Sequence, residues 1–135
     1  MSRRWRDGRG SASVELAILA PLVGLLLGAL VLVGRVQLAR ADVEGAARSA
    51  ARDLSIARDP YLAADMVRAG LMTTLDVGSP TCRTLSFMPD IGSARVAVTL
   101  TCTVDLSEAA VLPVPGSMSV SATAAEVIDT YREGP

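Results

Sequence analysis

The sequence predicts an α+β fold in which a long N-terminal helix packs on a small antiparallel sheet. Three observations support this prediction. The 19 residues from Leu16 to Gly34 carry no charge, and a pattern of apolar residues at helical spacing follows them. Apolar residues then recur at every second position from Ala94 to Leu106, with mostly polar residues between them, which is typical of a half-buried strand. The first two features predict one continuous helix, and the third predicts a sheet for it to pack on.

The long helix is expected to cover residues 11–58 and to include a transmembrane segment at about residues 15–34. An uncharged apolar run of this length is long enough to span a bilayer. Serine residues near the start of this segment are good N-caps for the helix. Pro21 predicts a kink within the helix, and membrane helices tolerate such a kink. The helix is expected to end at Asp59-Pro60, because a residue before proline is disfavoured in the α conformation.

The outer part of this helix is expected to lie against the chain's own head or a neighbouring molecule. Its apolar residues recur at steps of three and four, which places them on one face. Charged residues occupy the other faces, and Glu44 and Arg48 are spaced for an i,i+4 ion pair. The predicted apolar face consists of Val43, Ala47, Ala50, Leu54 and Ala57.

The head, residues 59–135, is expected to contain a second helix and three strands. The helix is predicted over Tyr61–Leu75, with Leu62, Met66, Ala69, Leu71 and Leu75 as its apolar positions. The strands are predicted at Thr81–Met88, Ala94–Leu106 and Ser117–Ile128. A turn at Pro89–Gly92 is expected to join the first two strands, and a loop at Leu112–Gly116 is expected to lead to the third.

Charge predicts how the chain is oriented in a membrane. Residues 1–10 contain four arginines and one acidic residue, whereas residues 59–135 contain nine acidic residues and four arginines, a net charge of −5. The positive-inside rule therefore places residues 1–10 in the cytoplasm as a leader and the head outside. The acidic head would repel a phosphate backbone, so nucleic acid is not expected as a partner.

The two cysteines, Cys82 and Cys102, are interpreted as a disulfide that stabilises the head. An extracytoplasmic compartment is oxidising, and a bond closing a loop of this length contributes about 3 kcal/mol in the chain-entropy model. Two buried free thiols are the alternative.

No catalytic, metal-binding or cofactor-binding set is recognisable. The chain has no histidine, and two cysteines separated by 20 positions do not form a zinc motif. The chain is therefore predicted not to be an enzyme. Gly24 and Gly28 match the small-xxx-small pattern of helix packing in membranes.

Glu15 is the candidate functional residue, because a carboxylate inside a membrane helix is costly and calls for a partner. Gly10 lies five positions before it. Cleavage between Gly10 and Ser11 by a membrane aspartyl peptidase, as in a class III signal, would create a new α-amine at Ser11. That amine on one subunit can pair with Glu15 of its neighbour and set the register of assembly.

Two alternatives remain open. Ala39-Arg40-Ala41 satisfies the small-x-small rule, so a signal peptidase could cut after Ala41 and release a soluble binding domain. The apolar run is longer than in most signal peptides, and the helical period continues through that position. The other alternative is a structural protein that stays anchored in the membrane without any processing.

Residues 10–21, from Gly10 through Glu15 to Pro21, resemble the N-terminal motif of TadE-like proteins, which are pseudopilins, or minor pilins, of the Tad (tight-adherence) system that builds Flp pili. Leu16 stands where that family usually has Phe or Tyr. The resemblance implies a type IV pilin-like arrangement, processing by the prepilin peptidase, and a single-pass location in the cytoplasmic (inner) membrane or in a surface pilus. It also implies that the chain works with other pilin subunits, inner-membrane platform proteins, a secretion ATPase and membrane lipid.

Overall fold

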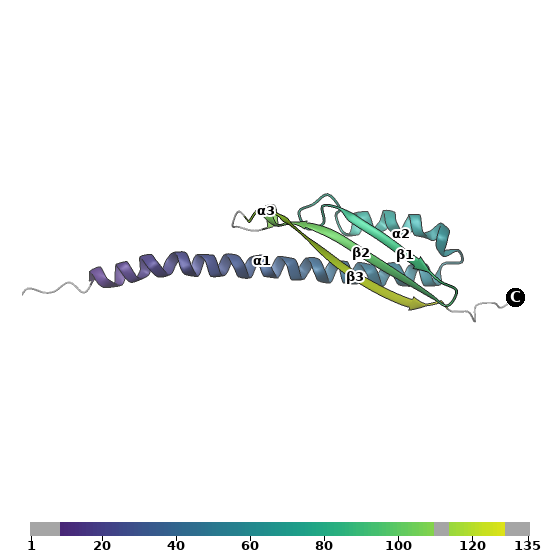
Figure 1. Ribbon diagram of the computed structural model, residues 1–135, viewed down its shortest axis with the longest axis horizontal. Helices are drawn as coiled ribbons and strands as arrows, with labels where there is room; N and C mark the ends of the chain where they lie inside the picture. The colour runs from purple at the N-terminus through teal and green to yellow at the C-terminus, as the bar shows by residue number, and fades with distance from the viewer. Residues whose placement is uncertain (1–8, 110–113, 129–135) are drawn as a thin grey trace, which may run out of the picture.

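The computed structural model describes residues 9–109 and 114–128, and its elements form a long helix with a small head on its C-terminal half (Figure 1). The helices and strands are, in chain order, α1 (Arg9–Ile56), α2 (Pro60–Thr74), β1 (Leu85–Ile91), β2 (Arg95–Asp105), α3 (Leu106–Ala109) and β3 (Ser117–Val127). The predicted α+β, pilin-like arrangement of one long helix on an antiparallel sheet is confirmed. Residues 1–8 of the predicted leader and residues 112 and 113 of the predicted loop lie outside the described residues.

Helix α1 has two parts with different surroundings. From residue 12 to residue 38 its side chains are mostly exposed, and Figure 1 shows this part extending beyond the head. From Ala39 to Leu54 one face is buried. The helix therefore enters the head at Ala39, within one continuous stretch of α-helix.

The buried face of α1 is made mainly of small side chains, so the helix can approach the sheet closely. Larger side chains come from the strands opposite, where Leu100 and the valines of β2 are fully buried. Ala57, the last residue of the predicted face, lies just beyond the helix and is half-buried. The rest of that prediction is confirmed, and the buried set on α1 is Ala39, Val43, Ala46, Ala47, Ala50, Ala51 and Leu54.

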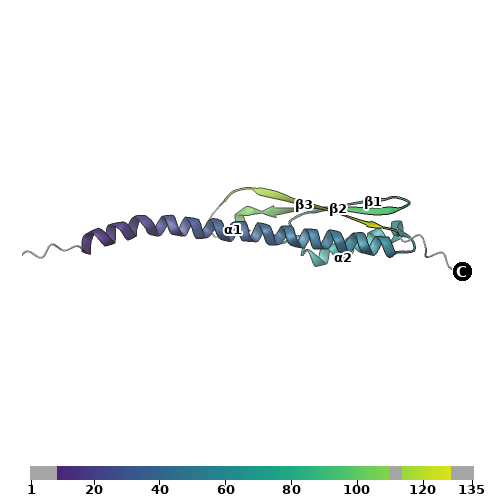
Figure 2. The ribbon, with the colours of Figure 1, turned by 90° about the horizontal axis from the view of Figure 1, so that it is seen from below.

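The sheet has the strand order β1-β2-β3, and both pairs of neighbours are antiparallel. Figure 2 shows the sheet lying along one side of α1. β2 is the central strand, and its residues alternate between buried and half-buried along almost its whole length, as the period-two pattern predicts. Cys102 of β2 is paired with Leu85 of β1 and Val120 of β3, so this cysteine lies on the face directed at the helix.

The predicted turn at Pro89–Gly92 is wrong, because β1 continues through Pro89 to Ile91. The Gly92 amide donates to the Arg95 carbonyl at the end of the β1–β2 ladder. Hydrogen-bonding residues alternate along an antiparallel strand, so Pro89, three positions earlier, has its nitrogen directed away from β2. Proline is tolerated at such a position on an edge strand, and the strand therefore starts and ends later than the sequence suggested.

The predicted apolar positions on α2 are only partly correct. Leu71 and Leu75 are buried, but Leu62 and Met66 are 74% and 78% exposed. Ala63, Ala64 and Val67 pack against the core instead. The helix is therefore rotated so that a stripe of apolar side chains faces outward.

Asp59 and Pro60 end α1 and also begin α2. The Asp59 carboxylate accepts hydrogen bonds from the amides of Tyr61 (3.0 Å) and Leu62 (3.2 Å), which makes it the N-cap of α2. Pro60 occupies the first helical turn, where a missing N–H is harmless. The sharp reversal between the two helices therefore follows from this dipeptide.

Candidate functional site

The projecting part of α1 is long and apolar enough to cross a membrane, and none of its most apolar stretch is buried in the protein. A core helix of a soluble protein would be covered by its own fold. Glu15 lies on this exposed part, and within residues 9–109 and 114–128 it forms no ion pair. The Glu15 carboxylate can therefore pair with a group on another molecule.

The other residues predicted at the site lie along the same helix. The backbone of Gly10 and Ser11 forms part of the first turn of α1, five and four positions before Glu15. The helix continues through Pro21, and the predicted kink there stays a prediction. Gly24 is exposed, and a Cβ added to it would meet no atom within 4 Å, whereas Gly28 is half-buried.

The proposed signal-peptidase position after Ala41 lies inside the continuous helix. Ala39, two positions before it, is buried in the head, and Val43, two positions after it, is also buried. A cut between them would remove a core residue and leave a helix end at the edge of the core. This geometry weighs against release of the head by cleavage after Ala41.

A disulfide joins Cys82 to Cys102, as predicted, with an S–S distance of 2.04 Å. Both half-cystines are buried, and Cys82 lines a small cavity with Ala39 and Val43 of α1. Cys82 precedes β1 instead of lying within it. The bond therefore ties the loop between α2 and β1 to the central strand, close to the point where α1 enters the head.

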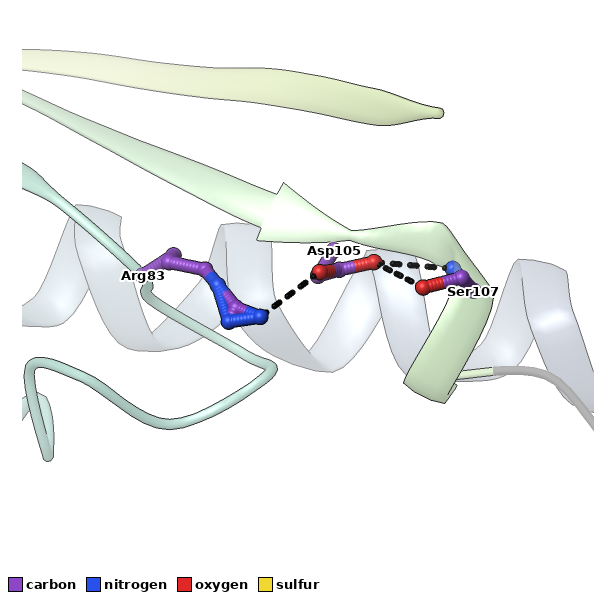
Figure 3. Close-up of polar contacts among 3 residues, drawn as sticks. All are labelled: Arg83, Asp105 and Ser107. Atoms are coloured by element: carbon purple, nitrogen blue, oxygen red, sulfur yellow. Dashed lines mark hydrogen bonds and ion pairs between the residues drawn. The ribbon is translucent and has the colours of Figure 1, made fainter. Parts of the chain in front are cut away.

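A polar contact beside the disulfide was not predicted. The Arg83 guanidinium lies 3.1 Å from one Asp105 carboxylate oxygen, and the Ser107 amide donates to the other at 3.0 Å (Figure 3). The Ser107 hydroxyl also donates to that second oxygen. The Asp-x-Ser spacing at a strand end is a signal for such a local turn, but the Arg83 partner comes from 22 positions away. Arg83 and Asp105 thus fasten the same loop that the disulfide holds.

These hydrogen bonds make stability depend on pH. The side-chain and backbone hydrogen bonds from Ser107, together with the charge of Arg83, lower the pKa of Asp105 below its ordinary value. A carboxyl group with a lowered pKa in the folded state stabilises the fold above its unfolded pKa, about 3.9, and this contribution is lost as the pH falls through the folded value.

We expect Asp105→Asn to destabilise the head at pH 7 and to have little effect near pH 2. Urea unfolding of both chains across this range measures the difference in the free energy of unfolding. Asp90→Asn removes an exposed carboxylate from β1 and serves as the control. If the difference in the free energy of unfolding between wild type and Asp105→Asn stayed constant with pH, the assigned role of the carboxylate would be contradicted.

The part of the chain that the structure describes contains no cluster of three or more metal-ligating side chains. What the arrangement provides is a membrane-length apolar helix with one exposed carboxylate, joined rigidly to a disulfide-stabilised head.

Comparison with known proteins agrees with this geometry. Residues 10–52 match the family described as TadE-like protein. No curated protein and no solved structure is significantly similar to the chain. The matched region begins at Gly10, includes Glu15 and extends through most of the α1 face that packs in the head. TadE-like proteins belong to the Tad pilus system and are generally non-catalytic components. The chain therefore carries a TadE-like family domain at residues 10–52.

Proposed function

We propose that this protein is a pseudopilin, or minor pilin, that takes part in assembling a Tad/Flp-type adhesive pilus or a related secretion filament. In this proposal α1 anchors the chain in the cytoplasmic membrane with the head outside. The prepilin peptidase cuts after Gly10, and the mature chain begins at Ser11. The observation that carries the proposal is the match to the TadE-like family over the helix that contains Glu15.

The continuity of α1 supports retention of the helix after processing. The apolar part and the buried face of the head belong to one stretch of α-helix from Arg9 to Ile56. At 1.5 Å per residue this helix is about 70 Å long, more than twice the thickness of a bilayer core. A rigid connection of this kind transmits the position of the head to the part that packs in the membrane.

In the assembled state Glu15 pairs with the α-amine of Ser11 on a neighbouring subunit. A carboxylate in a membrane is costly when it has no partner, and a pair that is also hydrogen-bonded reduces this cost. The exposed position of Glu15 on α1 leaves it accessible to such a neighbour. The carboxylate and the amine can pair at only one axial offset between neighbouring helices. The pairing therefore selects the axial register of assembly.

The partners in this proposal follow from the chemistry of each surface and from the family. The prepilin peptidase acts at Gly10 and Ser11, other pilin subunits pack on the apolar half of α1, and lipid surrounds it before assembly. The inner-membrane platform and the secretion ATPase of the Tad system supply the movement out of the membrane.

The experiment that tests this proposal is the intact mass of the protein extracted from membranes. A mature chain that starts at Ser11 is expected, with or without a methyl group on the new amine. A start at Asp42 would identify a secreted domain, and a start at Met1 would identify an unprocessed anchor; either result would refute the proposed processing.

A further inference from the structure

The height of the head above the membrane follows from the length of the apolar run in α1. The uncharged run from Leu16 to Gly34 is about 28 Å long at 1.5 Å per residue, which matches the hydrocarbon core of a bilayer. Ala39, where the buried face of α1 begins, lies about 8 Å further along the helix. Each headgroup layer is about 5 to 8 Å thick. The head therefore begins at the outer headgroup layer, directly above the hydrocarbon.

The head also covers part of α1 on the membrane side of Ala39. Among residues 12–38, only Gly28, Leu32 and Val36 are half-buried, and the others are exposed. These three positions are four residues apart and lead to Ala39 three residues later, so they continue the buried stripe of the helix. Elements of the head therefore extend from Ala39 toward the hydrocarbon.

Helix α3 and the start of β3 form the end of the head that is nearest to the projecting part of α1. Figure 1 shows α3 at that end of the sheet, and α3 lies against α1. Figure 2 shows the start of β3 at the same end. The Leu106 amide donates to the Gly116 carbonyl and joins the two segments. We call this part, residues 106–108 and 114–118, the membrane-facing end of the head.

The exposed side chains at this level suit an interface between water and lipid. Met118 is on the helix side of the sheet, because it pairs with the buried Val104, yet it is 38% exposed. Pro115 is exposed. On α1, Leu38 is 66% exposed about 6 Å beyond the end of the apolar run. Glu108 of α3 is also exposed, and a carboxylate is costly in hydrocarbon, so it limits the depth of this end to the headgroup layer.

Two arginines of α1 lie at the level of the lipid phosphates. Arg35 directly follows the apolar run, and Arg40 lies five residues later. Both are exposed, and neither forms an ion pair in the part of the chain that the structure describes. Helix geometry places them about 140° apart, on the two sides of the stripe that carries Val36 and Ala39. Guanidinium groups bind phosphate strongly, so lipid phosphates complement both flanks of this stripe.

We propose that the membrane-facing end of the head rests in the outer headgroup layer of the bilayer, with Arg35 and Arg40 bound to lipid phosphates. This inference rests on the proposed function, because it requires α1 to span a membrane. The partner is a phospholipid surface, whose phosphates match the guanidinium groups and whose upper acyl chains match Met118 and Pro115. The contact holds the head at one height above the membrane before assembly.

The test places a single tryptophan at this end of the full-length chain, in vesicles of phosphatidylcholine and phosphatidylglycerol. Trp5 is the only tryptophan of the sequence, so Trp5→Phe gives a background without one, whether or not residues 1–10 are removed. In that background Pro115→Trp is expected to lose at least about half of its emission to lipids that carry a quencher on the headgroup. A quencher at the end of the acyl chain, near the bilayer centre, is expected to have little effect.

Leu62→Trp is the matched control, because this residue is 74% exposed and lies in the first turn of α2, at the far end of the head. About 25 Å of helix separates that end from Ala39, so less than about a tenth of its emission is expected to be quenched. Met118→Trp is a second reporter at the membrane-facing end and leaves the proline in place. Thermal unfolding shows that each variant keeps its fold.

The role of the arginines is tested by adding Arg35→Gln and Arg40→Gln to the Pro115→Trp chain. Loss of both guanidinium groups is expected to lower the quenching by headgroup-labelled lipid at least about twofold. Arg48→Gln with Arg52→Gln removes two exposed arginines further from the membrane and is expected to leave the quenching unchanged. Undiminished quenching without Arg35 and Arg40 would overturn the assignment of these residues to lipid phosphates.

A reporter inside the membrane separates this inference from the proposed function. Leu25 is the middle residue of the apolar run, and Leu25→Trp is expected to be quenched most by the label at the end of the acyl chain. If it is, and neither reporter at positions 115 and 118 is quenched by any lipid, the inference is overturned while the membrane anchor stands. Equal quenching at position 115 by headgroup and deep labels would overturn the placement in the headgroup layer. No quenching of Leu25→Trp would overturn the anchor and the inference together.

Discussion

Glu15→Gln is expected to leave cleavage after Gly10 intact and to abolish incorporation into a filament. The substitution keeps the size of the side chain and removes the charge that pairs with the neighbour's α-amine. Breaking a buried pair by removing one partner costs about 3 kcal/mol or more, which corresponds to a loss of roughly a hundredfold in association. Intact mass measures processing, and the amount of the subunit in sheared filaments measures incorporation.

The matched control is Glu44→Gln on the same helix. Glu44 is half-exposed and forms only a long contact with Arg48 outside the apolar part of α1, and exposed i,i+4 pairs contribute a few tenths of a kcal/mol. This variant is expected to be processed and incorporated like wild type. Normal incorporation of Glu15→Gln would show that charge pairing does not set the register.

Loss of the Cys82–Cys102 disulfide is expected to be the largest single effect on the stability of the head. The bond closes a separation of 20 residues, for which the chain-entropy model gives about 3 kcal/mol. For a domain of this size that corresponds to a fall in Tm on the order of 15 °C. Thermal unfolding of the Cys82→Ser, Cys102→Ser double variant measures it.

Reduced wild-type protein is the control for this variant, because it loses the bond but keeps both sulfur atoms. The two samples are expected to unfold at similar temperatures, and both well below oxidised wild type. A wild-type Tm and a gel mobility that do not change on reduction would contradict the presence of a stabilising disulfide in the purified protein.

The order and type of most elements could be read from the sequence because the periodic signals are long. The alternation in residues 94–106 sets both the strand and the buried face of β2. The apolar positions from Val43 to Leu54 on α1 were correct for the same reason, since four residues at helical spacing define one face. The disulfide was inferred from compartment and loop length and is present in the structure.

Where the sequence signal was short or ambiguous, tertiary contacts determined the local structure. Helix α2 carries apolar residues on several faces, so its period could not show which face is buried. Contact with α1 and with the core turned Ala63 and Val67 inward and left Leu62 and Met66 outside. Pro89 resembled a turn signal because the sequence does not reveal that β1 is an edge strand.

The sequence by itself determined the membrane-length helix, the carboxylate at Glu15 and the glycine five positions before it, because each depends on spacing along one chain. Only the tertiary structure decided that the buried face of α1 begins at Ala39 and that Leu62 and Met66 of α2 face outward. Both features arise where α1 meets elements from the head. Contacts between distant segments depend on how side chains fill space, and the spacing of residues does not encode that packing directly.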